Sequence, residues 1–203
     1  DGFLDNPLRE DYVIQNQWNF RSNNLHMELG ANYVHSNSVS GNLYLHDSLT
    51  PSTSEGEYKV QLNTDKISGF AKIGYLFPNE DFKSLAIQLS GAYNDQHAQF
   101  GVRDYQGYQT SGYANLIFQQ EIGENSEENY YKVGASLQYD NVDETLQSEE
   151  AVFSMNGTYQ WKEWAPGIYG EFTRNTEKLG LILGLRGDYS NIFGAFLTPR
   201  FHL

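Results

Sequence analysis

Apolar and polar residues alternate along most of the chain with a period of two. Residues 25–34 show this alternation clearly: Leu25, Met27, Leu29, Ala31 and Tyr33 against His26, Glu28, Gly30, Asn32 and Val34. Because successive side chains of a strand point to opposite faces, this pattern predicts a β-strand with one apolar face. Similar patterns occur at about nine places, each about 10 residues long, which is enough for a tilted strand to cross a bilayer.

The alternation is clearest in residues 67–77, 85–94, 111–119, 131–140, 179–189 and 197–203, and it is weaker in residues 12–21 and 167–173. Mean hydropathy is -0.60, and no apolar run approaches the ~20 residues that a membrane helix needs. This excludes a helical membrane protein. A β-barrel stays possible, because its strands place only every second residue in lipid. We therefore predict an all-β chain that forms an antiparallel transmembrane β-barrel segment.

Aromatic residues stand at the ends of the apolar strand faces. The chain holds 15 Tyr, 12 Phe and 3 Trp, and amphipathic rings prefer the level of the lipid head groups. Tyr is also a good strand former, so a single one indicates little. Their recurrence predicts six lipid-interface aromatics: Tyr75, Phe77, Tyr93, Tyr131, Tyr139 and Tyr189.

The predicted connections alternate between short and long. Short turns are expected at residues 22–24, 78–81, 123–129 and 174–178. Longer loops are expected at residues 36–57, 95–106 and 141–160, with a brief one at 190–194. Outer-membrane barrels have short periplasmic turns and longer extracellular loops, so the pattern favours that class over a soluble sandwich.

The composition excludes several kinds of function. A net charge of -13 argues against nucleic acid, which needs a basic surface. The absence of cysteine excludes a disulfide scaffold and a thiolate metal site. No nucleophile motif or phosphate-binding loop is present, and the five histidines have no metal-binding spacing. We expect no enzyme activity, no catalytic residue and no cofactor.

Two sets of polar residues are candidates for binding a cation or a ligand in the loops. One is His46 with Asp47; the other is the acidic set Asp140, Asp143, Glu144, Glu149 and Glu150, expected on or near one long loop. Carboxylate oxygens suit Ca²⁺, but such runs are more often solvated loop surface, and an exposed polar pair is also the favoured interpretation of His46 and Asp47. The sequence leaves open whether either set binds a metal.

Three charged residues lie on the face of the last strands that is predicted to point away from lipid: Arg186, Asp188 and Arg200. In a large barrel such side chains contact either the water of the lumen or a domain that plugs it. We expect them to form ion pairs inside the wall rather than to bind a ligand directly.

The C-terminal part resembles a known family. Residues 181–189, LILGLRGDY, and residues 194–203, GAFLTPRFHL, are similar to the late barrel of TonB-dependent receptors, where a G-L-R-x-D strand precedes a T-P-R strand. Residues 1–8 and 18–20 resemble mid-barrel segments of Bacteroidetes-type members. The rest of the resemblance is strand pattern and spacing.

The resemblance implies a role in transport. Such a receptor is a 22-strand barrel in the outer membrane of a Gram-negative bacterium, filled by its own plug domain. It takes up a scarce siderophore, cobalamin or metal chelate with energy supplied through TonB. The implied partners are outer-membrane lipid and lipopolysaccharide, the plug, TonB, and the small-molecule or metal-chelate ligand.

Residues 1–203 lack the plug, the TonB box and the terminal aromatic strand of a complete receptor. The chain opens in an apparent loop and closes in an apparent strand, so we expect a central-to-late barrel fragment. Its two open edges would prevent stable insertion alone. Two alternatives stay open: a small complete barrel of about 8 to 10 strands, acting as an adhesin or pore, and a soluble all-β binding module.

Overall fold

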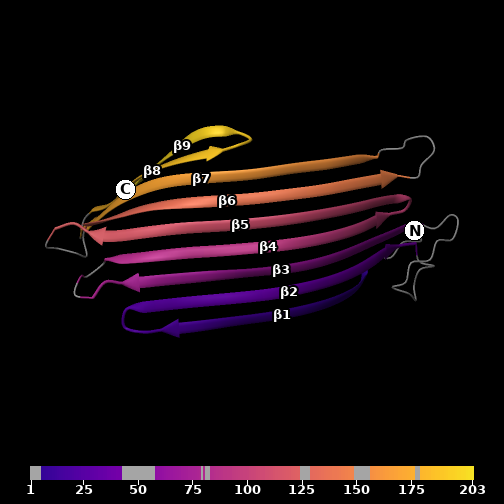
Figure 1. Cartoon of the computed structure of the whole chain (residues 1–203), viewed down its shortest axis with the longest axis horizontal. Helices are drawn as coiled ribbons and strands as arrows, with labels where there is room; N and C mark the ends of the chain where they lie inside the picture. Colours follow the sequence, from indigo (N-terminus) through magenta and orange to yellow (C-terminus); the bar gives the residue numbers. More distant parts are fainter. Residues whose placement is uncertain are drawn as a thin grey trace.

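The computed structural model describes residues 6–42, 58–78, 80, 83–123, 129–148, 156–176 and 179–203. They form a single antiparallel sheet of nine strands in sequence order (Figure 1). The strands are β1 (Leu8–Arg21), β2 (Leu25–Gly41), β3 (Lys59–Leu76), β4 (Ser84–Phe100), β5 (Arg103–Glu121), β6 (Asn129–Ser148), β7 (Gly157–Thr176), β8 (Leu179–Ser190) and β9 (Gly194–His202). The predicted all-β, nine-strand antiparallel fold is therefore confirmed.

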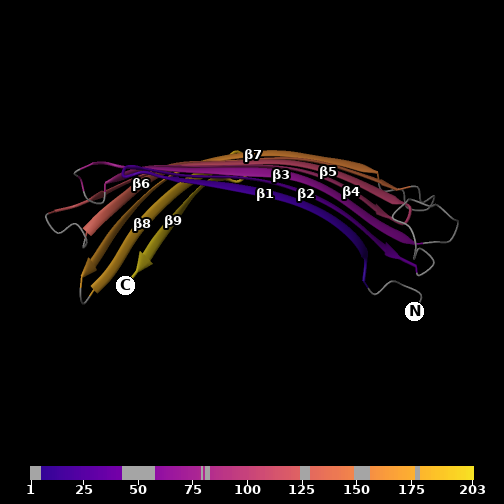
Figure 2. The same ribbon diagram turned by 90° about the horizontal axis from the view of Figure 1, so that it is seen from below.

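The sheet is arched rather than flat (Figure 2). β1 and β9 form its two edges and do not pair with each other within the described residues, so this part of the sheet is open. A search of the described residues found no helix long and apolar enough to span a membrane.

The register separates two chemically different faces. One face is apolar. On it, directly paired positions across β2 to β6 are occupied by Leu29, Ala71, Leu89, Ala114 and Leu137. On the opposite face, three residues after Leu29, Asn32 begins a row that continues through Ser68, Ala92, Ser111 and Asp140. Four of its five residues are polar. A hollow of about 540 Å³ lies over the polar row, so the polar face is the concave one and the apolar face is convex.

The apolar residues of the convex face are exposed. Ile14, Ile67 and Ile168 expose 67%, 58% and 71% of their surface. Among the described residues, Val39 and Ala98 are the only buried hydrophobic ones. The sheet is therefore held by its backbone ladder and cross-strand contacts, without a second layer packed on it.

The strands are longer than predicted, and several predicted loops are wrong. β4 and β5 continue through most of residues 95–106 and leave only Gly101 and Val102 as a turn, where Gly101 has a φ of 62°. β2 continues to Gly41, β6 continues to Ser148, and β7 begins at Gly157. Apolar alternation ends before the strands do, because a backbone ladder persists where both faces are polar.

Candidate functional site

The concave face carries the hollow and most of the cross-strand polar contacts. Its lining includes Gln15, Lys66, Tyr113, Gln138 and Asp140, together with short side chains and the ring of Phe70. The Asp140 Oδ2 atom accepts a hydrogen bond of 3.0 Å from the Gln138 amide. Lys66 has no ion pair within the described part of the chain. The concave face therefore presents donors, acceptors and both signs of charge.

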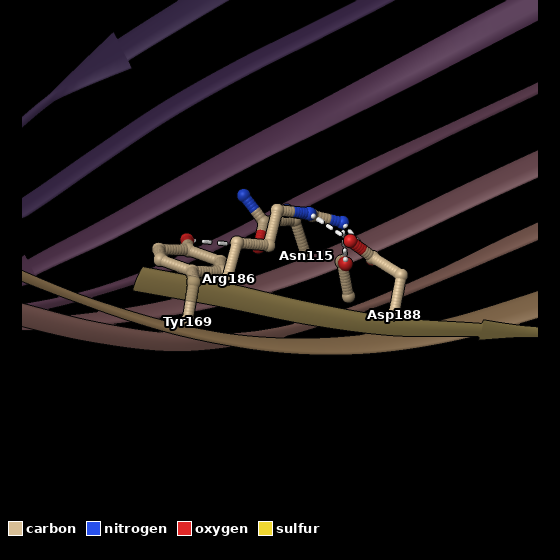
Figure 3. A network of polar contacts seen from close by, with 5 residues as sticks. Asn115, Tyr169, Arg186 and Asp188 are labelled. Atoms are coloured by element: carbon tan, nitrogen blue, oxygen red, sulfur yellow. Dashed lines mark hydrogen bonds and ion pairs between the residues drawn. The ribbon is translucent and has the colours of Figure 1, made fainter. Parts of the chain in front are cut away.

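Beside the hollow, Arg186 of β8 forms a two-point contact with Asp188. Arg186 Nε donates to Asp188 Oδ2 at 2.7 Å, and Arg186 Nη2 donates to Asp188 Oδ1 at 2.6 Å. Arg186 Nη2 also donates to Ser136 Oγ of β6 at 2.8 Å, across the intervening β7 (Figure 3). The sequence placed Arg186 and Asp188 on this face, and the structure joins them directly.

Tyr169 extends the same network toward β4. Its hydroxyl donates to Asn115 Oδ1 of β5 at 3.0 Å, and the Arg186 guanidinium lies 5.6 Å from its ring centroid (Figure 3). Asn115 in turn donates to Gln88 of β4 at 3.5 Å. One polar network, which we call the Arg186 network, therefore ties five consecutive strands from β4 to β8 together.

Two glycines make these crossings possible. A Cβ on Gly134 of β6 would lie 2.3 Å from Tyr169 Cζ, and a Cβ on Gly167 of β7 would lie 2.1 Å from Asp188 Oδ1. Any side chain at these positions would therefore occupy the space that Tyr169 and Asp188 now fill. Tyr169, Ser136 and Asn115 were not among the site residues predicted from the sequence. The signal is the direct pairing of Tyr169 with Gly134 on the neighbouring strand, which becomes visible only once the register is known.

Arg200 forms a separate and more exposed pair. Its Nη1 atom lies 3.0 Å from Glu171 Oε2, and Lys132 Nζ lies 3.8 Å from Glu171 Oε1. The side chains of Arg200 and Glu171 are 58% and 18% exposed, whereas those of Arg186 and Asp188 are 39% and 9% exposed. All three charged residues predicted to point inward thus lie on the concave face in ion pairs.

The difference in burial predicts unequal effects of removing each arginine. Arg186→Gln leaves the Asp188 carboxylate and Ser136 without their donor, and we expect a loss of about 1–2 kcal/mol in the free energy of unfolding. The matched Arg200→Gln change breaks an exposed pair and should cost less than about 1 kcal/mol. Denaturant titration of the complete protein in detergent measures both, and equal losses would contradict the assigned role of the Arg186 network.

A second cluster lies on the convex face, beyond its apolar part. Asp65 Oδ1 of β3 accepts a hydrogen bond of 2.6 Å from the Tyr33 hydroxyl and lies 2.9 Å from His35 Nδ1, both on β2. On β4 and β5, His97 Nε2 lies 3.0 Å from both Asp104 oxygens. Histidine–carboxylate pairs therefore join neighbouring strands where the convex face has become polar.

The contacts of Asp65 predict a measurable pKa. Hydrogen bonds from Tyr33 and then His35 hold the pKa of Asp65 below its ordinary value. A lowered folded-state pKa stabilises the fold at pH values above the unfolded pKa, and this contribution is lost as pH falls through the folded pKa. Carbon-13 NMR titration of the carboxyl group should show this pKa, and Tyr33→Phe should raise it. An unchanged value in the variant would refute the assigned cause.

The predicted loop position is wrong for Asp143 and Glu144, which lie in β6. Asp140 lies on the same strand, as its place in the alternating segment predicted. Pairing places Asp140 and Glu144 on the concave face and Asp143 on the convex face, because side chains alternate along a strand. Glu149, Glu150, His46 and Asp47 lie outside the described residues. Over the described ranges, no group of three or more His, Asp or Glu could hold a metal ion.

The predicted interface aromatics lie at the ends of the apolar face, although not all lie at strand ends. Tyr75 packs edge-on against Phe77 at 5.2 Å, and Tyr189 packs against Trp164 at 5.9 Å. Tyr131 packs against Phe118 at 6.2 Å between centroids. Tyr93 and Tyr139 lie in the middle of β4 and β6, because these strands continue into the polar region. They therefore mark where the face changes, not where the strand stops.

No protein-family model and no curated protein matches the sequence. Solved structures do match. FpvA of P. aeruginosa bound to a heterologous pyoverdine and iron aligns with 95% of this chain at a TM-score of 0.67 and 15% identity. The complex of FpvAI with pyocin S2 aligns over the same share at a TM-score of 0.66 and 16% identity.

The sheet has the fold of a TonB-dependent receptor barrel segment. The chain spans 32% of the length of each of these two structures. At this identity the likeness concerns the fold alone. The sheet in Figure 2 is arched and open. In a barrel of this fold its concave face would be the inner one.

Proposed function

We propose that this chain forms part of the wall of an outer-membrane receptor that takes up a scarce ligand. The observation that carries the proposal is the convex face, whose large apolar side chains are exposed across all nine strands. An exposed apolar surface of this extent marks an interaction site rather than an ordinary soluble surface. Lipid is the partner that a convex apolar barrel face fits.

The dimensions of the apolar face support a membrane-facing role. It runs from Leu25 to Tyr33 on β2, from Leu85 to Tyr93 on β4, and from Tyr131 to Tyr139 on β6. Each stretch is about nine residues long, which matches the length that a tilted strand uses to cross the hydrocarbon layer. Beyond Tyr33, Tyr93 and Tyr139 the strands continue as polar extensions, which would project toward lipopolysaccharide and the extracellular side.

The likeness to FpvA supports the choice of a receptor over a simple pore. The matching structures were solved with pyoverdine and iron and with pyocin S2. For this chain we propose a siderophore, cobalamin or metal chelate as the cargo, with energy supplied through TonB and a plug domain. The wall itself carries no catalytic role in this proposal.

The open edges support a larger assembly. β1 and β9 have no strand partner on their outer sides within the described sheet, and an open edge is not tolerated in lipid. We propose that further strands of the same protein continue the sheet at both edges, so that residues 1–203 are a partial barrel of a 22-strand, Bacteroidetes-type receptor. A closed barrel of these nine strands would need a β1–β9 pairing that the described sheet lacks.

The orientation of the wall can be tested with single cysteines, since this chain contains none. Cysteine replaces Leu89 on the convex apolar face, Ser90 on the concave face, or Gln99 on the convex polar extension, all in β4. Each cysteine carries a fluorophore in the complete protein, which is reconstituted in bilayers with brominated acyl chains. We expect strong quenching at Leu89→Cys only. Equal quenching at Leu89→Cys and Ser90→Cys would reject a lipid-facing convex side.

A further inference from the structure

The hollow on the concave face contains one cation and one anion that do not neutralise each other. Lys66 of β3 and Asp140 of β6 both line it, in a lining that extends from β1 to β6. Lys66 forms no ion pair within the described ranges, and the hydrogen bond to Asp140 comes from an uncharged amide, that of Gln138. Both charges are therefore open to a partner of opposite charge.

We propose that this hollow binds a zwitterionic, peptide-like molecule, with a carboxylate at Lys66 and an ammonium at Asp140. The inference rests on the proposed function, because it gives the chemistry of a ligand subsite inside the receptor wall. A charge-assisted hydrogen bond at each end would fix the direction of the molecule along the wall. A ligand with only one charge would leave the other wall charge without a partner.

The spacing of the two charges sets the length of the ligand. β3 and β6 are separated by three strand intervals, which is about 14 Å at 4.8 Å per interval. Lys66 is level with Val142, two residues from Asp140 along β6, which adds about 7 Å along the strand and brings the separation of the two backbone positions to about 16 Å. An extended lysine side chain can cover part of this distance. An extended tripeptide spans about 10 Å, so a molecule of about three peptide units would connect the two charges.

The floor of the hollow suits a peptide backbone. Ser68, Ser90 and Ser111 have short side chains and leave space above the sheet, whereas the ring of Phe70 covers Gly30. The side-chain amides of Gln15 and Gln138 offer donors and acceptors for peptide groups. The volume of about 540 Å³ lies within the usual range for small-molecule sites.

The test uses three probes of equal length on the complete protein in detergent. Triglycine carries both charges, triglycinamide lacks the carboxylate, and N-acetyltriglycine lacks the ammonium. Binding is followed by saturation-transfer NMR of the peptides, which reports weak affinities. For the unmodified protein we expect triglycine to bind about fivefold more tightly than either capped peptide.

Two variants test which wall residue binds which end of the peptide. Lys66→Gln should abolish the preference for triglycine over triglycinamide and keep the preference over N-acetyltriglycine. Asp140→Asn should do the opposite. The matched changes Lys72→Gln on β3 and Glu144→Gln on β6 lie on the same face outside the hollow, and they should alter neither preference. Ser90→Trp, which fills the floor, should remove binding of all three peptides.

Absence of binding to the unmodified protein would overturn the inference and would favour a hollow occupied by another segment of the same protein. The inference would also be overturned if Lys66→Gln and Asp140→Asn both kept the full preference for triglycine over each of the two capped peptides. Heat-modifiable migration of the outer-membrane protein on electrophoresis tests the barrel separately. If the unmodified protein is heat-modifiable but binds no triglycine, only the proposed subsite is refuted. If the unmodified protein shows no heat-modifiable migration, the proposed function is refuted.

Discussion

Leu89→Arg is expected to lower the free energy of unfolding of the complete barrel in bilayers by about 3 kcal/mol. Leu89 lies in the middle of the convex apolar face and is 41% exposed. An arginine at the bilayer midplane of a transmembrane barrel costs about 2–4 kcal/mol, and this cost falls toward about 0–1 kcal/mol near the interface. The measurement is reversible denaturant unfolding of the protein in phospholipid vesicles.

Gln99→Arg provides the matched control. Gln99 lies on the same strand and the same face as Leu89, but in the polar extension beyond Tyr93. The same added charge should therefore cost less than about 1 kcal/mol. Equal costs at the two positions would show that the convex face does not meet lipid at Leu89.

Gly134→Ala is expected to cost about 2–3 kcal/mol. The new methyl group would lie 2.3 Å from Tyr169 Cζ and 2.7 Å from the backbone carbonyl oxygen of Leu116. Overpacking of a fixed site costs about 1–3 kcal/mol, and the displaced Tyr169 would also lose its hydrogen bond to Asn115. The measurement is the same unfolding titration.

Gly74→Ala is the matched control for this second change. Gly74 lies on the concave face of β3, and a Cβ there would meet no atom within 4 Å. Alanine should be neutral or should stabilise the strand by about 0.5–1 kcal/mol, since glycine loses more conformational freedom on folding.

Adding Tyr169→Ala to Gly134→Ala should recover only part of the loss, because the Leu116 carbonyl stays in place. Full recovery would mean that the backbone does not constrain Gly134.

The alternation of side chains was sufficient to predict nine strands, but not their lengths. Apolar periodicity reports where one face avoids water, and it ends at Tyr93 and Tyr139. The strands continue to Phe100 and Ser148, because hydrogen bonds to neighbouring strands hold a backbone whose side chains are polar on both faces. For this reason the acidic residues around Asp143 were predicted on a loop and lie in β6.

The sequence by itself determined which residues share a face. Residues that alternate with period two must separate onto two sides of any strand, so Arg186, Asp188 and Arg200 were predicted on one side from the pattern alone. Only the tertiary structure decided which of them meet. Arg186 reaches Ser136 two strands away, and Tyr169 reaches Asn115, because strand register and the gaps at Gly134 and Gly167 set those contacts. Register depends on pairing between segments far apart in the chain, which a local pattern does not encode.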